Sequence, residues 1–88
     1  MMTEHELFKI ATKELIKIFG KKYLQDNFEN TCKSYGIVDD TRYMFFAGFK
    51  GSSDIPERIA DNHGWVVYAL FYINTQNGTF IKKEYALE

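Results

Sequence analysis

Cys32 is the one side chain here that could serve as a thiol nucleophile, and it would need a base beside it. A thiolate forms when an imidazole lies within hydrogen-bonding reach, so His5 and His63 are the possible partners. Cys32 also shares an apolar helical stripe with Leu24 and Phe28, and free cysteines are commonly small buried hydrophobic residues. We therefore interpret Cys32 as an inert core residue and His5 as a solvated one.

A second set, in residues 50–64, has the chemistry of a divalent metal site or an acid–base pair: Asp54, Glu57, Asp61 and His63. On a short helix Glu57 and Asp61 would share a face, but two carboxylates and a histidine lack a firm third ligand. Asp54 and Glu57 also have capping-box spacing, which gives them a structural task. We expect a solvated loop surface and neither a metal nor a cofactor.

Two further motifs are incomplete. Asp39, Asp40 and Thr41 could begin a calcium loop, but the alternating oxygens and the terminal Glu are missing, so a turn is expected. Gly48 and Gly51 do not stand in the tight strand-to-helix spacing of a phosphate loop. The sequence therefore predicts no nucleotide site.

The strongest structural signal is residues 65–73, WVVYALFYI, which hold no charge and are too short to cross a bilayer. Their β-branched and aromatic residues predict a central strand. Alternation would place Trp65, Val67, Ala69, Phe71 and Ile73 on one face and Val66, Tyr68, Leu70 and Tyr72 on the other. Neither face is polar, so both need to be covered.

The chain then returns as a hairpin. Asn77 and Gly78 tolerate the positive φ of a tight turn, and residues 79–87 predict the partner strand. The charges at Lys82, Lys83 and Glu84 suit an edge strand, where they discourage pairing with another chain.

An N-terminal helix is expected over residues 4–19. Thr3 and Glu6 have capping-box spacing, an apolar stripe follows, and Gly20 is a natural stop.

The secondary structure of residues 21–38 is ambiguous. We favour a second helix over 22–35 ended by Gly36; the alternative is a strand over 32–38 that turns at Asp39 and Asp40 and pairs with the next strand.

Residues 42–49, RYMFFAGF, predict a strand antiparallel to 65–73, with Tyr43 and Phe45 on one face and Met44 and Phe46 on the other. The long connection over 50–64 predicts a short helix at 55–61 because Pro56 suits a first turn. The expected fold is α+β: one or two N-terminal helices packed on a three-stranded antiparallel meander with the 65–73 strand in the centre.

Length and composition limit the function. A chain of 88 residues forms one domain, and Lys+Arg 11 against Asp+Glu 12 gives no case for nucleic acid. A lone cysteine cannot form an internal disulfide, and the charged N-terminal segment is not a signal peptide. We expect a cytoplasmic protein without membrane insertion, or an exported one if a leader has been removed. Residues 87–88 resemble an expression-vector remnant.

The surplus of apolar surface is the functional clue, because one helical layer hides only one face of a sheet. The residues expected to contact a partner or ligand are Met44, Phe46, Tyr68, Tyr72, Ile59 and His63. Tyrosine hydroxyls suit an interface or a semi-polar cleft better than a dry core.

The final hairpin, YINTQNGTFIKKE, following a helix and a meander, resembles the small helix-over-sheet modules of the PepSY and cystatin-like kind. The resemblance implies a non-enzymatic role in which the module binds or restrains a peptidase or another partner. We therefore expect a non-catalytic interaction module that uses the aromatic sheet face and the 52–63 loop, with a protein partner or a homodimer.

The alternative is a small-ligand-binding protein or enzyme with a pocket between helix and sheet, as in nuclear-transport-factor-like folds. Such a pocket needs buried polar groups, and the candidates are Tyr43, Tyr68, Asp61 and His63.

Overall fold

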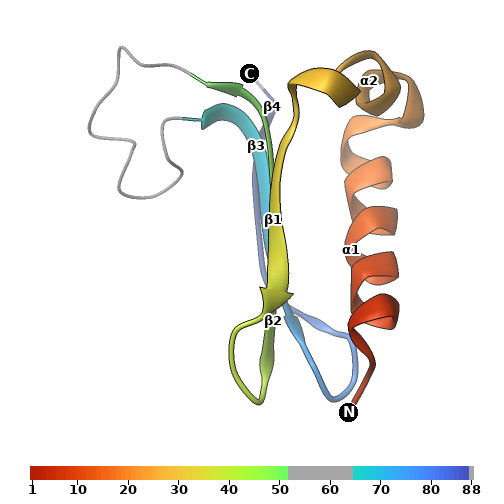
Figure 1. Ribbon diagram of the computed structural model, residues 1–88, viewed down its shortest axis with the longest axis vertical. Helices are drawn as coiled ribbons and strands as arrows, with labels where there is room; N and C mark the ends of the chain where they lie inside the picture. The colour runs from red at the N-terminus through yellow and green to blue at the C-terminus, as the bar shows by residue number, and fades with distance from the viewer. Residues whose placement is uncertain (52–64, 88) are drawn as a thin grey trace.

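A helix packed on one face of a four-stranded antiparallel sheet forms the architecture (Figure 1). The computed structural model describes residues 1–51 and 65–87. The elements in chain order are α1 (Glu4–Phe19), α2 (Lys21–Asp26), the 3-10 turn η1 (Phe28–Asn30), β1 (Cys32–Ile37), β2 (Arg42–Gly51), β3 (Trp65–Asn74) and β4 (Phe80–Leu87). The strand order is β1-β2-β3-β4. The α+β class is therefore as expected, but the sheet has four strands, not three.

The expected N-terminal helix is present with the expected bounds. The Thr3 hydroxyl accepts a hydrogen bond from the Glu6 amide at 3.1 Å, and the Glu6 carboxylate accepts one from the Thr3 amide at 2.9 Å. This capping box satisfies two donors of the first turn. The chain leaves the helix at Gly20, whose φ of 87° favours glycine.

The favoured helix over 22–35 is wrong. Only α2 and η1 are helical there, and β1 follows, paired antiparallel with β2 from Cys32 opposite Gly48 to Ile37 opposite Tyr43. The alternative interpretation, a strand turning at Asp39 and Asp40, describes this segment. The weak helix formers from Asn27 to Ser34 do not extend a helix, because β2 offers β1 a ladder of backbone hydrogen bonds.

The hydrophobic core lies between α1 and the sheet. Leu7, Ala11 and Leu15 are buried on the helix. The sheet contributes Tyr43, Phe45, Ala47, Phe49, Val67, Ala69, Phe71 and Ile73. Rings stack across it, with Phe45 and Phe71 at a centroid distance of 6.0 Å. The period-two prediction for β2 and for most of β3 is thus confirmed on this side.

Trp65 departs from the predicted face. The register of β2 with β3 shifts between Gly48 and Lys50 and again between Lys50 and Gly51. A shift of one residue turns a side chain to the opposite face. Trp65 therefore lies against Gly48 and Phe46 on the side away from α1, while Val66 packs against the core.

Thr75 joins three parts of the chain at one end of the sheet. Its hydroxyl donates to the Asp40 carbonyl at 2.6 Å, and its amide donates to the Thr41 carbonyl at 3.1 Å. Its own carbonyl accepts from the Met2 amide at 2.8 Å. Thr75 is fully buried, so these bonds fix the two turns and the N-terminus together.

No helix in residues 1–51 and 65–87 is both long enough and apolar enough to cross a membrane.

Candidate functional site: the outer face of the sheet

We call the sheet face opposite α1 the outer face; no helix or strand of the described residues lies on it (Figure 1). The strand registers arrange its residues in three rows that cross all four strands. The rows are Gly36, Met44, Tyr72, Lys82; Ser34, Phe46, Leu70, Glu84; and Cys32, Gly48, Tyr68, Ala86. Apart from Gly48, the two interior strands thus carry large, mainly apolar side chains, and the edge strands carry small or charged ones.

Three aromatic side chains cluster at one end of this face, with Phe46 in contact with the other two. The Phe46 ring lies 6.2 Å from that of Tyr68 and 6.5 Å from that of Trp65 between centroids. Phe46 and Tyr68 are each only 8% exposed. A partner approaching the outer face would therefore reach the margins of this group but little of Phe46 itself.

A polar link lies beside the aromatic group. The Tyr68 hydroxyl donates to Oε2 of Glu84 at 2.6 Å, and Lys82 Nζ lies 3.3 Å from Oε1 of the same carboxylate. The Tyr68 hydrogen bond, followed by the bond and charge of Lys82, lowers the pKa of Glu84. Glu84 is therefore charged at neutral pH, and its carboxylate orients the tyrosine on the interior strand.

The reachable apolar part of the outer face is Met44, Leu70 and Tyr72, which are partly buried and adjacent in the register. The Arg42 guanidinium lies over the Tyr72 ring at 5.5 Å from its centroid. In contacts of this kind the cation is attracted electrostatically to the face of the ring. The result is a patch of three apolar side chains bordered by a cation at one end and by Lys82 and Glu84 along one side.

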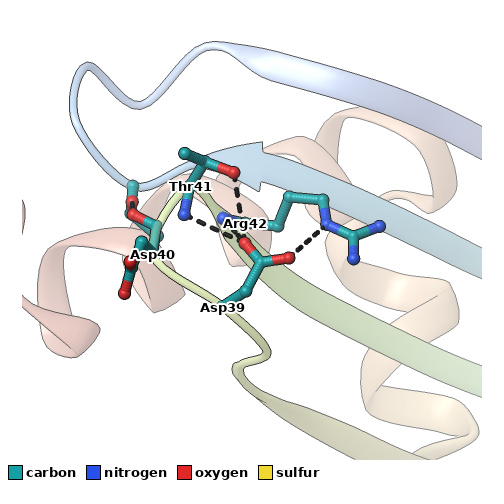
Figure 2. Close-up of polar contacts among 5 residues, drawn as sticks. Asp39, Asp40, Thr41 and Arg42 are labelled. Atoms are coloured by element: carbon teal, nitrogen blue, oxygen red, sulfur yellow. Dashed lines mark hydrogen bonds and ion pairs between the residues drawn. The ribbon is translucent and has the colours of Figure 1, made fainter.

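Asp39 holds Arg42 in this position (Figure 2). Its Oδ2 accepts a hydrogen bond from Arg42 Nε at 2.9 Å, and its Oδ1 accepts from the Arg42 and Thr41 amides, each at 2.9 Å. The Thr41 amide above all, then the Arg42 side chain, lowers the pKa of Asp39. The Asp39 carboxylate thus accepts hydrogen bonds from its own turn, and the expected turn at these residues is present.

The cysteine and the histidine that could have formed a reactive pair are far apart. Cys32 is exposed and on the outer face at the start of β1, so its interpretation as a core residue is wrong. His5 lies on the α1 side, where it lines a pocket of about 310 Å³ with Tyr35 and Gly36 near the opposite end of β1. The second possible base, His63, lies outside the described residues. No group of three metal-ligating side chains occurs in the described parts of the chain.

Two of the polar groups expected in a pocket between helix and sheet, Tyr43 and Tyr68, lie on opposite faces of the sheet. Tyr43 is buried on the α1 side, where burial raises its pKa to about 12, whereas Tyr68 is on the outer face. Asp61 lies outside the described residues.

The helix side does have a groove of about 270 Å³ between α1, α2, η1 and the β1–β2 pair. It is lined largely by Phe8, Leu15, Ile16, Leu24, Phe28 and Phe49.

Of the expected contact residues, Met44, Phe46, Tyr68 and Tyr72 are brought together on the outer face. Ile59, like the rest of the 52–63 loop and the expected helix at 55–61, lies outside the described residues. Sequence reasoning missed three members of the site: Trp65, Arg42 and Glu84. Period-two counting could have found Glu84 and Arg42, which fall on the outer face in their own strands, but the register shift that turns Trp65 has no local signal.

No family model matches this chain, and neither a curated protein nor a solved structure matches it.

Proposed function

We propose that this protein is a non-catalytic interaction module that binds a protein partner through the outer face of its sheet. One observation carries the proposal: two interior strands present Met44, Leu70 and Tyr72 on a face that no described element covers. A sheet face of this composition is normally buried against another layer. A partner protein would supply that layer.

The make-up of the patch supports binding over catalysis. Tyr, Met and Arg are enriched in protein interfaces, and here Tyr72, Met44 and Arg42 are neighbours. Lys82 and Glu84 lie at the margin of the patch, where protein interfaces usually carry polar or charged side chains. The aromatic group of Phe46, Tyr68 and Trp65 gives the patch a stiff base. The resemblance to PepSY and cystatin-like modules, which implies partner binding, points the same way.

Affinity capture with matched variants tests the proposal. Leu70→Lys places a charge in the centre of the patch, whereas Ile81→Lys places the same charge on β4 at an apolar side chain that is 52% exposed. Circular dichroism establishes that both variants are folded. A genuine partner is retained by the native chain and by Ile81→Lys but is lost by Leu70→Lys. Equal retention by all three baits contradicts the use of the outer face.

A small-ligand-binding function is the second candidate, favoured by the apolar groove between α1 and β1. Its volume of about 270 Å³ is slightly below the usual range for ligand pockets. An NMR fragment screen separates the two functions. Shifts that converge on Phe8, Leu24 and Phe49 support a groove ligand, and an absence of such shifts rejects it.

A further inference from the structure

The sheet has two edges, and they are protected to different degrees. In the described part of the chain, β1 pairs only with β2, so one side of its backbone is unpaired. β4, at the other edge, carries Lys82, Lys83 and Glu84. β1 holds a single charge, Lys33, in six residues. Charged side chains are a usual means of blocking an exposed edge, so β1 is the edge that is left open to pairing.

Exposed apolar side chains also collect along the open edge. Tyr35 within β1 is 53% exposed, and Phe28 before it and Val38 after it are 70% and 50% exposed. Lys33 lies over the Phe28 ring at 5.7 Å and has no carboxylate within ion-pair distance among the described residues. The edge thus offers backbone hydrogen-bonding groups, apolar surface and a lysine that forms no ion pair with another described residue.

We propose that a second copy of this chain pairs with this edge, β1 against β1 in antiparallel orientation, about a two-fold axis that passes through the sheet at Ser34. Two four-stranded sheets would then form one continuous sheet with both α1 helices on the same side. The contact uses the free backbone edge of β1 and not the patch of Met44, Leu70 and Tyr72. The proposal therefore does not depend on the function proposed for that patch.

The side chains of β1 favour its own copy as the partner. In this register Lys33 stands opposite Tyr35 of the partner subunit, and both lie on the α1 side of the sheet. Each ammonium group thereby gains an aromatic ring, and the two Lys33 residues are offset along the strands and do not face each other. Ser34, the residue that meets itself, is small and uncharged.

Light scattering over a dilution series, with matched variants, tests the edge. Tyr35→Lys and Tyr85→Lys change tyrosines on opposite edge strands that face α1 and are 53% and 49% exposed. The native chain and Tyr85→Lys should form dimers that dissociate on dilution, and Tyr35→Lys should dissociate at least tenfold more easily. A chain that is monomeric at every concentration overturns the proposal. So does a dimer that Leu70→Lys dissolves and Tyr35→Lys does not, a result that would assign self-association to the outer face.

Charge swapping at Ser34 tests the register without relying on a residue that packs on the core. Ser34→Lys or Ser34→Glu alone places like charges opposite each other at the axis and should yield monomers. An equal mixture of the two variants should dimerise again. Failure of the mixture to dimerise, when the native chain does, rejects the two-fold axis at Ser34.

The exposed thiol of Cys32 gives an independent distance. In the proposed dimer Cys32 stands opposite Gly36 of the partner subunit, so the two Cys32 Cα atoms are offset by four residues and lie about 14 Å apart. Nitroxide labels on Cys32 should show dipolar broadening that is lost when unlabelled chain is added in excess. A labelled dimer without broadening contradicts this register.

Discussion

The indole ring of Trp65 lies directly over Gly48, so that a Cβ at position 48 would stand 2.5 Å from the ring. Glycine in the interior of a strand weakens it unless another group needs the space, and here that group is the tryptophan. The contact fixes Trp65 beside Phe46 and thereby builds the aromatic end of the outer face.

Replacing Gly48 with alanine should therefore be costly. The methyl group overlaps the indole, and overpacking of this kind lowers the free energy of unfolding by about 1–3 kcal/mol. Denaturant unfolding measures the loss. In a Trp65→Ala background the obstruction is gone, so the same glycine substitution should cost much less. Equal losses in both backgrounds would show that the ring is not the reason for the glycine.

The hydrogen bond from Tyr68 to Glu84 predicts a pH-dependent effect. Tyr68→Phe should lower the free energy of unfolding by about 1 kcal/mol at neutral pH, because a hydrogen bond to a partly exposed carboxylate is lost. The pKa of Glu84 is lower in the folded chain than its ordinary value of 4.5. Its contribution is therefore full above pH 4.5 and declines as the pH falls through the folded pKa. Thermal unfolding from pH 7 to pH 3 should show the native chain and the variant converging; a gap that does not change with pH argues against the carboxylate as acceptor.

Tyr43 should ionise at a higher pH than an ordinary tyrosine side chain. Burial raises its pKa to about 12, from an ordinary value of 10, because the ionised phenolate would lose its hydration. Stability from this group is full below pH 10 and is lost as the pH rises through 12. Absorbance at 295 nm should show a late ionisation step, and Tyr43→Phe should remove that step alone. A native titration curve without a late step contradicts the assignment.

Thr75 should matter through its hydroxyl, not through its volume. Thr75→Val keeps the shape of the side chain but removes the donor to the Asp40 carbonyl, at a cost of roughly 1–2 kcal/mol. Thr75→Ser keeps the donor and loses a methyl group. Denaturant unfolding measures the stability that each variant loses. In NMR spectra the turn signals of the serine variant should lie nearer to those of the native chain than the signals of the valine variant do. A valine variant with unshifted Asp40 and Thr41 amide signals would show that the hydroxyl does not hold the turn.

The parts of the fold that the sequence predicts are those with local causes. The bounds of α1 follow from a capping box at Thr3 and a glycine at position 20, both of which act within one helical turn. The hairpin of β3 and β4 follows from Asn77 and Gly78, and Gly78 has the positive φ, 73°, that the turn requires.

The parts that it misses have distant causes. β1 forms because Arg42–Gly51 lies beside it to pair with, and helical periodicity within 21–38 does not register that neighbour. For the same reason the sequence predicts that the outer face is aromatic but does not predict all of its residues. Alternation places Met44, Phe46, Tyr68 and Tyr72 together, whereas Trp65 joins them only through the register shift.

An NMR map of the bound partner shows whether the outer face is the surface that the partner contacts. A protein retained by the native chain and lost by Leu70→Lys is titrated, once purified, into the isotopically labelled chain. The largest shifts should fall on Met44, Leu70, Tyr72 and Lys82. Shifts confined to α1 and the groove beside β1, with the outer face unchanged, would contradict this prediction.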